Sequence, residues 1–68
     1  MPTTMRLDPG AERIAEAGQV LKMYGDGAPR FIAARIGALA VDGDAAGVRR
    51  WIEIAGHVSA LMGLKAVH

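Results

Sequence analysis

The chain has 68 residues, of which 51% are hydrophobic and only 4% are aromatic, and its net charge is +1. A single domain of this length hides only about 60% of the surface that its unfolded form exposes, so its core is thin. The absence of cysteine excludes disulfides and cysteine-based metal sites, and the near-neutral charge gives no general attraction to nucleic acid or to anionic membranes.

A core built mainly of Ala, Ile, Leu, Val and Met is typical of helical proteins. We therefore expect a soluble, all-α chain of three short helices. No segment approaches the ~20 apolar residues that span a bilayer, so the expected location is the cytoplasm. We expect residues 1–7 to be a flexible N-terminus, residues 8–63 to be a single three-helix domain and residues 64–68 to be a C-terminal tail.

The first predicted helix begins at Asp8-Pro9 and runs to about Tyr24. Asp8 can accept hydrogen bonds from the free N–H groups of the first turn, and Pro9 loses no hydrogen bond there. Gly25 ends this helix, because only glycine enters the left-handed conformation without steric cost. The expected buried stripe consists of Ile14, Ala17, Val20, Leu21 and Tyr24.

Asp26 can cap a second helix, which should end near Val41. The turn Asp42-Gly43-Asp44 supplies the next cap, so a third helix at about 45–62 should fold back antiparallel on the second. Gly63 is its natural terminator. The side chains expected in the core, or in an interface with another chain, are Phe31, Ile32, Ile36, Leu39, Val48, Trp51, Ile52, Ala55 and Val58.

Glycines also lie inside the predicted helices, where each costs up to about 1 kcal/mol relative to alanine. Neighbouring alanines would let helix axes approach closely there, within the chain or between chains. The alternative is that a glycine- and alanine-rich genome supplied them without a structural reason. The glycines in question are Gly18, Gly37, Gly47 and Gly56.

Few side chains could carry out chemistry. Ser59 and His57 are two residues apart and point away from each other on a helix, so they form no nucleophile–base pair. Glu53 and His57 share a helix face, but a metal site needs a further pair of ligands, and we interpret them as a solvated contact. We expect no enzyme activity, no cofactor, no metal and no small-molecule substrate.

Residues 38–51 are similar to a helix-turn-helix in the placing of their small and apolar side chains, which would allow DNA binding. The residues that would face the bases, 45–47, carry no hydrogen-bonding side chain, so a DNA-binding regulator is the less favoured alternative. In the simpler interpretation Arg49 pairs with Glu53, and Arg50 is solvated. The arginines that could contact phosphates are Arg30, Arg35, Arg49 and Arg50.

Residues 20–62 resemble a family of short bacterial proteins of unknown function. The shared pattern is a glycine-rich turn, an I-A-x-R-I-x-x-L helix, a G-D-x-x-G turn and a helix that contains tryptophan. The residues that carry it are Gly25–Leu39, Gly43, Asp44, Gly47 and Trp51. The resemblance implies that Gly43, Asp44 and Trp51 belong to the scaffold, and it implies no activity. The N-terminal part departs from the family, whose first helix is rich in aromatic residues, whereas this chain has only Tyr24 there.

These features predict a non-catalytic helical interaction module or small subunit. The apolar positions of the third helix cover more than one stripe, which indicates contacts on two sides. A core of this size usually needs a disulfide, a metal or a second subunit for support. The expected partner is a second copy of the chain or another protein; nucleic acid is less favoured, and no membrane partner is expected.

Overall fold

The computed structural model describes residues 9–66, and the side chains of residues 10–64 within them. These residues contain no strand, which confirms the all-α class. None of the described helices has both the length and the apolar character needed to cross a bilayer. The elements are α1 (Pro9–Tyr24), the 3-10 turn η1 (Gly25–Gly27), α2 (Ala28–Val41) and α3 (Ala45–Ala66).

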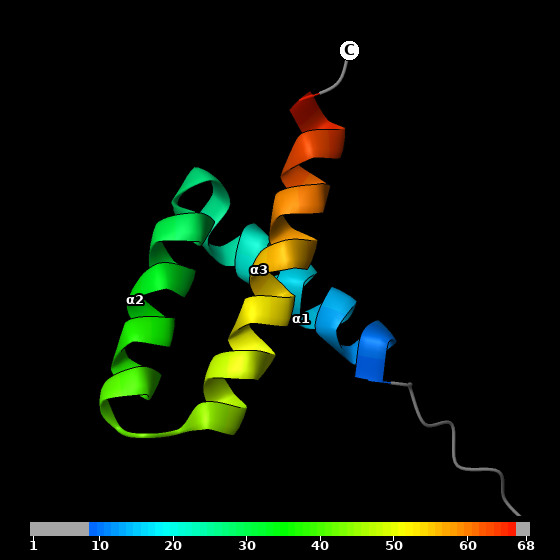
Figure 1. The fold of residues 1–68 in the computed structure, drawn as a ribbon. Coiled ribbons are helices and arrows are strands. Elements are labelled where there is room, and N and C mark those ends of the chain that lie inside the picture. Colours follow the sequence, from blue (N-terminus) through cyan, green and yellow to red (C-terminus); the bar gives the residue numbers. More distant parts are fainter. Residues whose placement is uncertain (1–8, 67–68) are drawn as a thin grey trace, which may run out of the picture.

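The expectation of three separate short helices was wrong. The turn η1 joins α1 to α2 without a non-helical residue between them, so residues 9–41 form one bent helical segment and α3 forms the second. The bend lies at Gly25, whose φ of +53° is the left-handed conformation predicted for it. The two segments pack against each other (Figure 1).

Of the three predicted aspartate caps, two lie among the described residues, and they had different outcomes. Asp44 caps α3, because its Oδ1 accepts a hydrogen bond of 2.8 Å from the N–H of Gly47. Asp26 does not cap α2, whose N-cap residue is Gly27 and has no side-chain hydrogen bond. The physical reason is that η1 continues the helix, so backbone carbonyls already serve the first N–H groups of α2: Ala28 donates to the carbonyl of Gly25. The proposed cap Asp8 lies outside the described residues.

The chain reverses direction between α2 and α3. Gly43 adopts a φ of +74°, and the N–H of Asp44 donates to the carbonyl of Leu39 at 2.9 Å. From this turn α3 runs back alongside α2 (Figure 1). It continues to Ala66, past the predicted terminator Gly63. A glycine costs only about 1 kcal/mol inside a helix, so it does not end one by itself.

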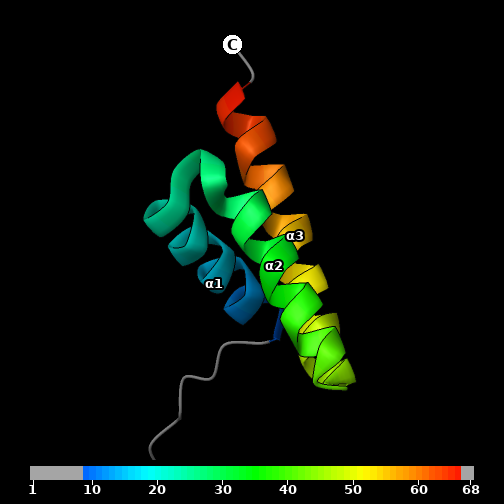
Figure 2. The same ribbon diagram turned by 90° about the vertical axis from the view of Figure 1, so that its left-hand side faces the viewer.

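The helix α3 packs against both α1 and α2. Seen along the edge in Figure 2, α1 lies on one side of the α2–α3 pair, and no other described element covers the opposite side. The core between the helices is small, and its largest fully buried side chains are Ile32, Ile54 and Val58. The smaller buried residues are Ala17, Val20 and Ala28.

Part of the predicted stripe of α1 was wrong. Ala17 and Val20 are buried, but Ile14 is 51% exposed and Tyr24 is 42% exposed. The side of α1 that meets α3 also carries charge, since Glu16 on it forms an ion pair with Arg50 of α3. An apolar pattern on α1 alone could not reveal this rotation, because the partner charge lies 34 residues away.

Candidate interaction surface

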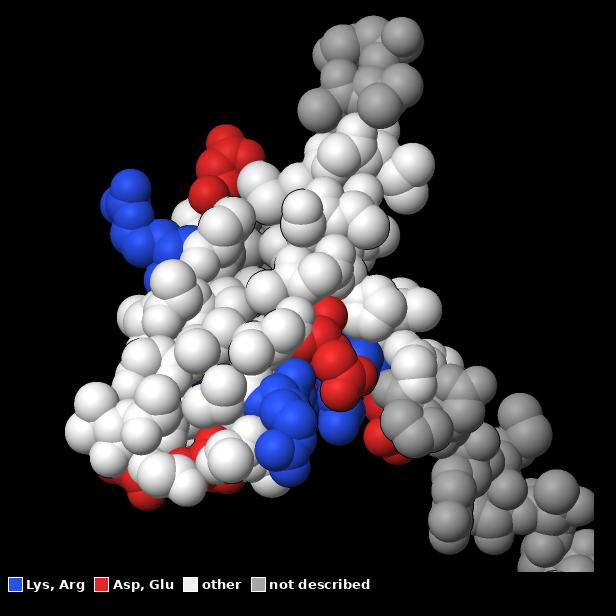
Figure 3. Space-filling model, in the orientation of Figure 1, with Lys and Arg blue, Asp and Glu red and all other residues white. Residues whose placement is uncertain are grey.

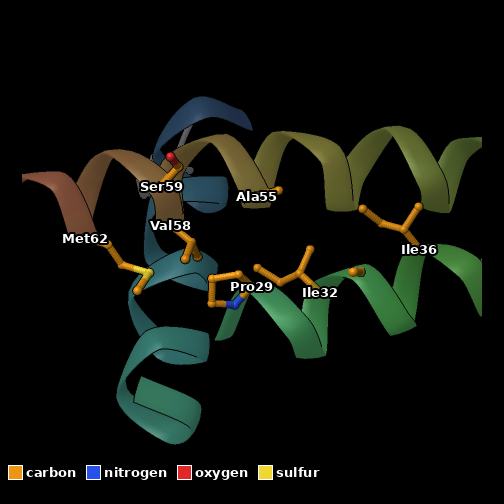
Figure 4. A pocket seen from close by; sticks show the side chains of 8 residues that line it. Pro29, Ile32, Ile36, Ala55, Val58, Ser59 and Met62 are labelled. Atoms are coloured by element: carbon orange, nitrogen blue, oxygen red, sulfur yellow. The ribbon is translucent and has the colours of Figure 1, made fainter. Parts of the chain in front are cut away.

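A groove of about 300 Å³ runs between α2 and α3. In the close view of Figure 4, α1 lies behind the groove, which therefore opens on the side that no other described element covers. Ile32 and Val58, both buried, form its floor. The remaining lining residues are Pro29, Ala33 and Ile36 of α2 and Ala55, Ser59 and Met62 of α3.

The groove is one end of a longer uncharged strip on the two helices, and the strip continues from it toward the turn at 42–44. Ala40 follows Ile36 by four residues, and Ile52 precedes Ala55 by three, so each lies on the same side of its helix as the groove. Ile52 is 55% exposed. We define the α2/α3 face as Pro29, Ala33, Ile36, Ala40, Val48, Ile52, Ala55, Ser59 and Met62.

The residues of this face carry no charge, and their only polar side chain is that of Ser59. At the turn end, Ala40 and Val48 also line a second hollow together with Asp44 and Arg49, so charged side chains border the face there. Figure 3, which looks onto α2 and α3, shows uncharged surface between them and places the charged side chains toward the borders of this area. An exposed surface without charge, hollowed along its length, favours contact with another apolar surface over contact with a charged ligand.

The predicted core and interface residues fall into three groups. Ile32 and Val58 are buried, whereas Ile52 is exposed and contributes nothing to the core of the single chain. Trp51 packs at the edge of the core, with its ring 5.9 Å from that of Phe31. The other half-buried members are Phe31, Ile36, Leu39, Val48 and Ala55.

The sequence prediction missed two core residues, Ala28 of α2 and the larger Ile54 of α3. Ile54 is fully buried, and it precedes Val58 by four residues on the same side of α3. That spacing was the available signal. It was obscured because apolar residues occupy several sides of α3, so the pattern did not show which of Ile52 and Ile54 faces inward.

Charged side chains join α1 to α3 at a distance from the groove. Arg13 donates to Glu16 at 2.9 Å and lies 3.9 Å from Glu53, and Arg50 also pairs with Glu16. The expectation that Arg50 is merely solvated was therefore wrong, and the structure pairs Glu53 with Arg13 instead of Arg49. The two contacts that cross from α1 to α3 are long-range, so helical spacing alone did not indicate them.

The arginines proposed for the DNA-binding alternative are partly engaged within the chain. Besides the pairing of Arg50 with Glu16, the guanidinium of Arg35 lies 5.8 Å from the centre of the Trp51 ring. Arg30 and Arg49 are exposed. The structure thus does not present all of these side chains as one free basic patch.

The interior glycines differ in their surroundings. A Cβ added at Gly47 would lie 2.5 Å from Oδ2 of Asp44 and 3.1 Å from Cδ2 of Leu39. At the others a Cβ would meet nothing within 4 Å, so a tight seam within the chain is wrong for them. Gly37 follows Ala33 by four residues, and Gly56 follows Ile52 by four, which places both glycines beside the α2/α3 face. The third open position is Gly18.

Residues 10–65 match the model of a family of unknown function (DUF6961), and the chain belongs to that family. This confirms the resemblance seen in the sequence. No curated protein and no solved structure is detectably similar to the chain. Among the described residues, no group of three or more His, Cys, Asp or Glu side chains is placed to hold a metal ion. Of the hollows on the described part of the chain, the groove between α2 and α3 is more apolar than the one beside Glu16 and Arg50 or the one beside Asp44 and Arg49.

Proposed function

We propose that this member of a family of unknown function is a non-catalytic helical interaction module that associates with itself. The observation that carries this function is the α2/α3 face, which is uncharged, hollowed by a groove of about 300 Å³ and open in the single chain. Contiguous apolar surface of this kind marks a site of interaction in a soluble protein.

The small core of the single chain also supports association with a partner. Among the residues whose side chains the structure describes, only three large ones are fully buried, namely Ile32, Ile54 and Val58. A core of this size rarely supplies more than about 3–5 kcal/mol. Ile52 is 55% exposed, and covering it would contribute about 1 kcal/mol. A partner seated on the face would therefore add stability that the isolated chain lacks.

The chemistry of the face supports a role in binding and not in catalysis. Catalytic pockets combine an apolar wall with several converging polar groups. The groove has a single polar side chain, Ser59, on its rim. His57, the nearest base in the sequence, does not line the groove.

Light scattering coupled to size-exclusion chromatography tests this function. Over a range of micromolar loading concentrations, we expect the measured mass to rise from the 7.1 kDa of one chain toward twice that value. Circular dichroism of the same samples shows whether the chain is helical. A well-folded chain that stays at 7.1 kDa at every concentration would refute self-association.

A further inference from the structure

We infer that the α2/α3 face binds the same face of a second copy, with the two copies antiparallel and related by a two-fold axis that lies in the interface. This arrangement rests on the proposed function, and it adds the identity of the surface and the way in which it pairs. Two layers of two helices would result, with each α1 on the outside, because α1 covers the other side of the pair (Figure 2).

The absence of charge on the face favours its own copy as the occupant. A two-fold interface sets one patch against the identical patch, so a charged side chain near the axis would meet a like charge. The α2/α3 face itself has no charged side chain, and the two charged residues that border its turn end, Asp44 and Arg49, are of opposite sign. An acidic or a basic partner, in contrast, would find no complementary charge there and would leave its own charges without partners.

The α2/α3 face contains both a groove and an exposed side chain, Ile52, that could enter the groove of a second copy. The groove lies between Pro29 and Met62 at one end and Ile36 at the other (Figure 4). Ile52, which lies nearer the turn at 42–44, is 55% exposed. An antiparallel pairing brings the turn end of one copy over the groove of the other, so each Ile52 approaches the partner's groove. Met62 has a flexible thioether side chain that can adapt to what enters.

The glycines beside the face supply a separate observation. Gly37 and Gly56 each lie within a helix, where glycine is unfavourable, and neither has a neighbour within 4 Å of an added Cβ. The single chain therefore gives no reason for them. A second copy seated on the α2/α3 face would come close to the backbone at both positions, which is where small residues are useful.

The size of the face agrees with a weak, reversible dimer. The 14 residues of α2 extend over about 21 Å, and two helices side by side are about 20 Å wide. Each copy would then contribute roughly 400 Å² in projection, and the ridged surfaces of two copies would bury on the order of 1,000 Å² in total. That value is at the lower end for specific interfaces, so we expect dissociation in the micromolar range.

Two matched pairs of variants test the pairing. Ala33→Arg on α2 and Ser59→Arg on α3 place a charge in the groove lining, whereas Ala34→Arg on α2 and Ala46→Arg, on the opposite side of α3 from Ala55, place it outside the lining. All four positions are exposed, so the variants should fold, which circular dichroism verifies. We expect the two groove variants to weaken dimerisation by at least about tenfold and the two control variants to change it by less than about threefold.

The outcomes separate the pairing from the proposed function. A wild-type chain that is monomeric at all concentrations would overturn both. A wild-type dimer that survives Ala33→Arg and Ser59→Arg, or that is broken equally by Ala34→Arg and Ala46→Arg, would overturn the pairing and leave self-association in place. Loss of the dimer in the groove variants alone supports the pairing.

A second test compares two glycine-to-alanine substitutions, which alter the surface less than an added arginine does. Gly56→Ala and Gly18→Ala both add one methyl group in open space within the chain, and both improve helix propensity. Because only Gly56 borders the α2/α3 face, we expect Gly56→Ala to weaken dimerisation severalfold and Gly18→Ala to leave it unchanged. Equal effects of the two substitutions on dimerisation would contradict the proposed position of the partner.

Discussion

Replacing Gly47 with alanine should destabilise the chain, although alanine is the better helix former. The gain in helix propensity is at most about 1 kcal/mol. A Cβ at this position would lie 2.5 Å from Oδ2 of Asp44 and 3.1 Å from Leu39. The Asp44 carboxylate would have to turn away from the new methyl group, which would weaken its 2.8 Å cap bond from the N–H of Gly47. Losing such a cap costs about 1 kcal/mol, and displacing Leu39 adds to that cost.

The sign of the effect should reverse once the cap is removed. In an Asp44→Ala background no carboxylate opposes the new methyl group, so Gly47→Ala should stabilise α3 by up to about 1 kcal/mol. Urea unfolding of the wild type, the two single variants and the double variant gives the coupling, which we expect to be about 1–2 kcal/mol. If Gly47→Ala stabilises the chain equally with and without Asp44, the close packing of cap and glycine has no energetic consequence.

Two further predictions compare neighbouring or similar residues. Ile54→Ala should lower the free energy of unfolding by about 2–5 kcal/mol, because Ile54 is fully buried. Ile52→Ala, at a position 55% exposed, should lower it by less than about 1 kcal/mol when measured below the concentration of dimerisation. Similar losses for the two variants in urea unfolding would contradict the burial of Ile54 and the exposure of Ile52. Glu16→Gln should lower the unfolding free energy by at most about 1 kcal/mol in low salt and by less in high salt, because the ion pairs of Glu16 are partly exposed. Glu12, which forms no ion pair among the described residues, provides the control. A Glu12→Gln variant that is equally destabilised would show that the loss comes from general charge and not from pairing.

The features that the sequence predicted correctly are local ones. The left-handed conformation at Gly25 and the cap at Asp44 depend on a few consecutive residues. Both follow from backbone sterics and from the free N–H groups at a helix start. The end of α2 at Val41 depends on the same kind of signal, since the turn residues that follow it are Asp42 and Gly43.

The features that depend on tertiary contact were not predictable in this way. Helical spacing permitted both Ile52 and Ile54 as inward positions, and only the placement of α1 and α2 around α3 selects Ile54. The pairing of Glu16 with Arg50 spans 34 residues, so no local pattern indicates it. The candidate surface was only partly foreseen: Ile36, Ile52 and Ala55 were expected at a core or an interface, but the groove between the helices exists only once they are side by side.

Isotope-filtered NMR on an equal mixture of ¹³C-labelled and unlabelled chains tests the paired α2/α3 faces most directly, since a dimer of 7.1 kDa chains is well within reach of the method. The pairing predicts intermolecular contacts from the methyl groups of Ile52 to those of Ala33, Ile36 and Ala55 in the other copy. Intermolecular contacts that arise instead from the exposed Ile14 of α1, with none from the α2/α3 face, would contradict it.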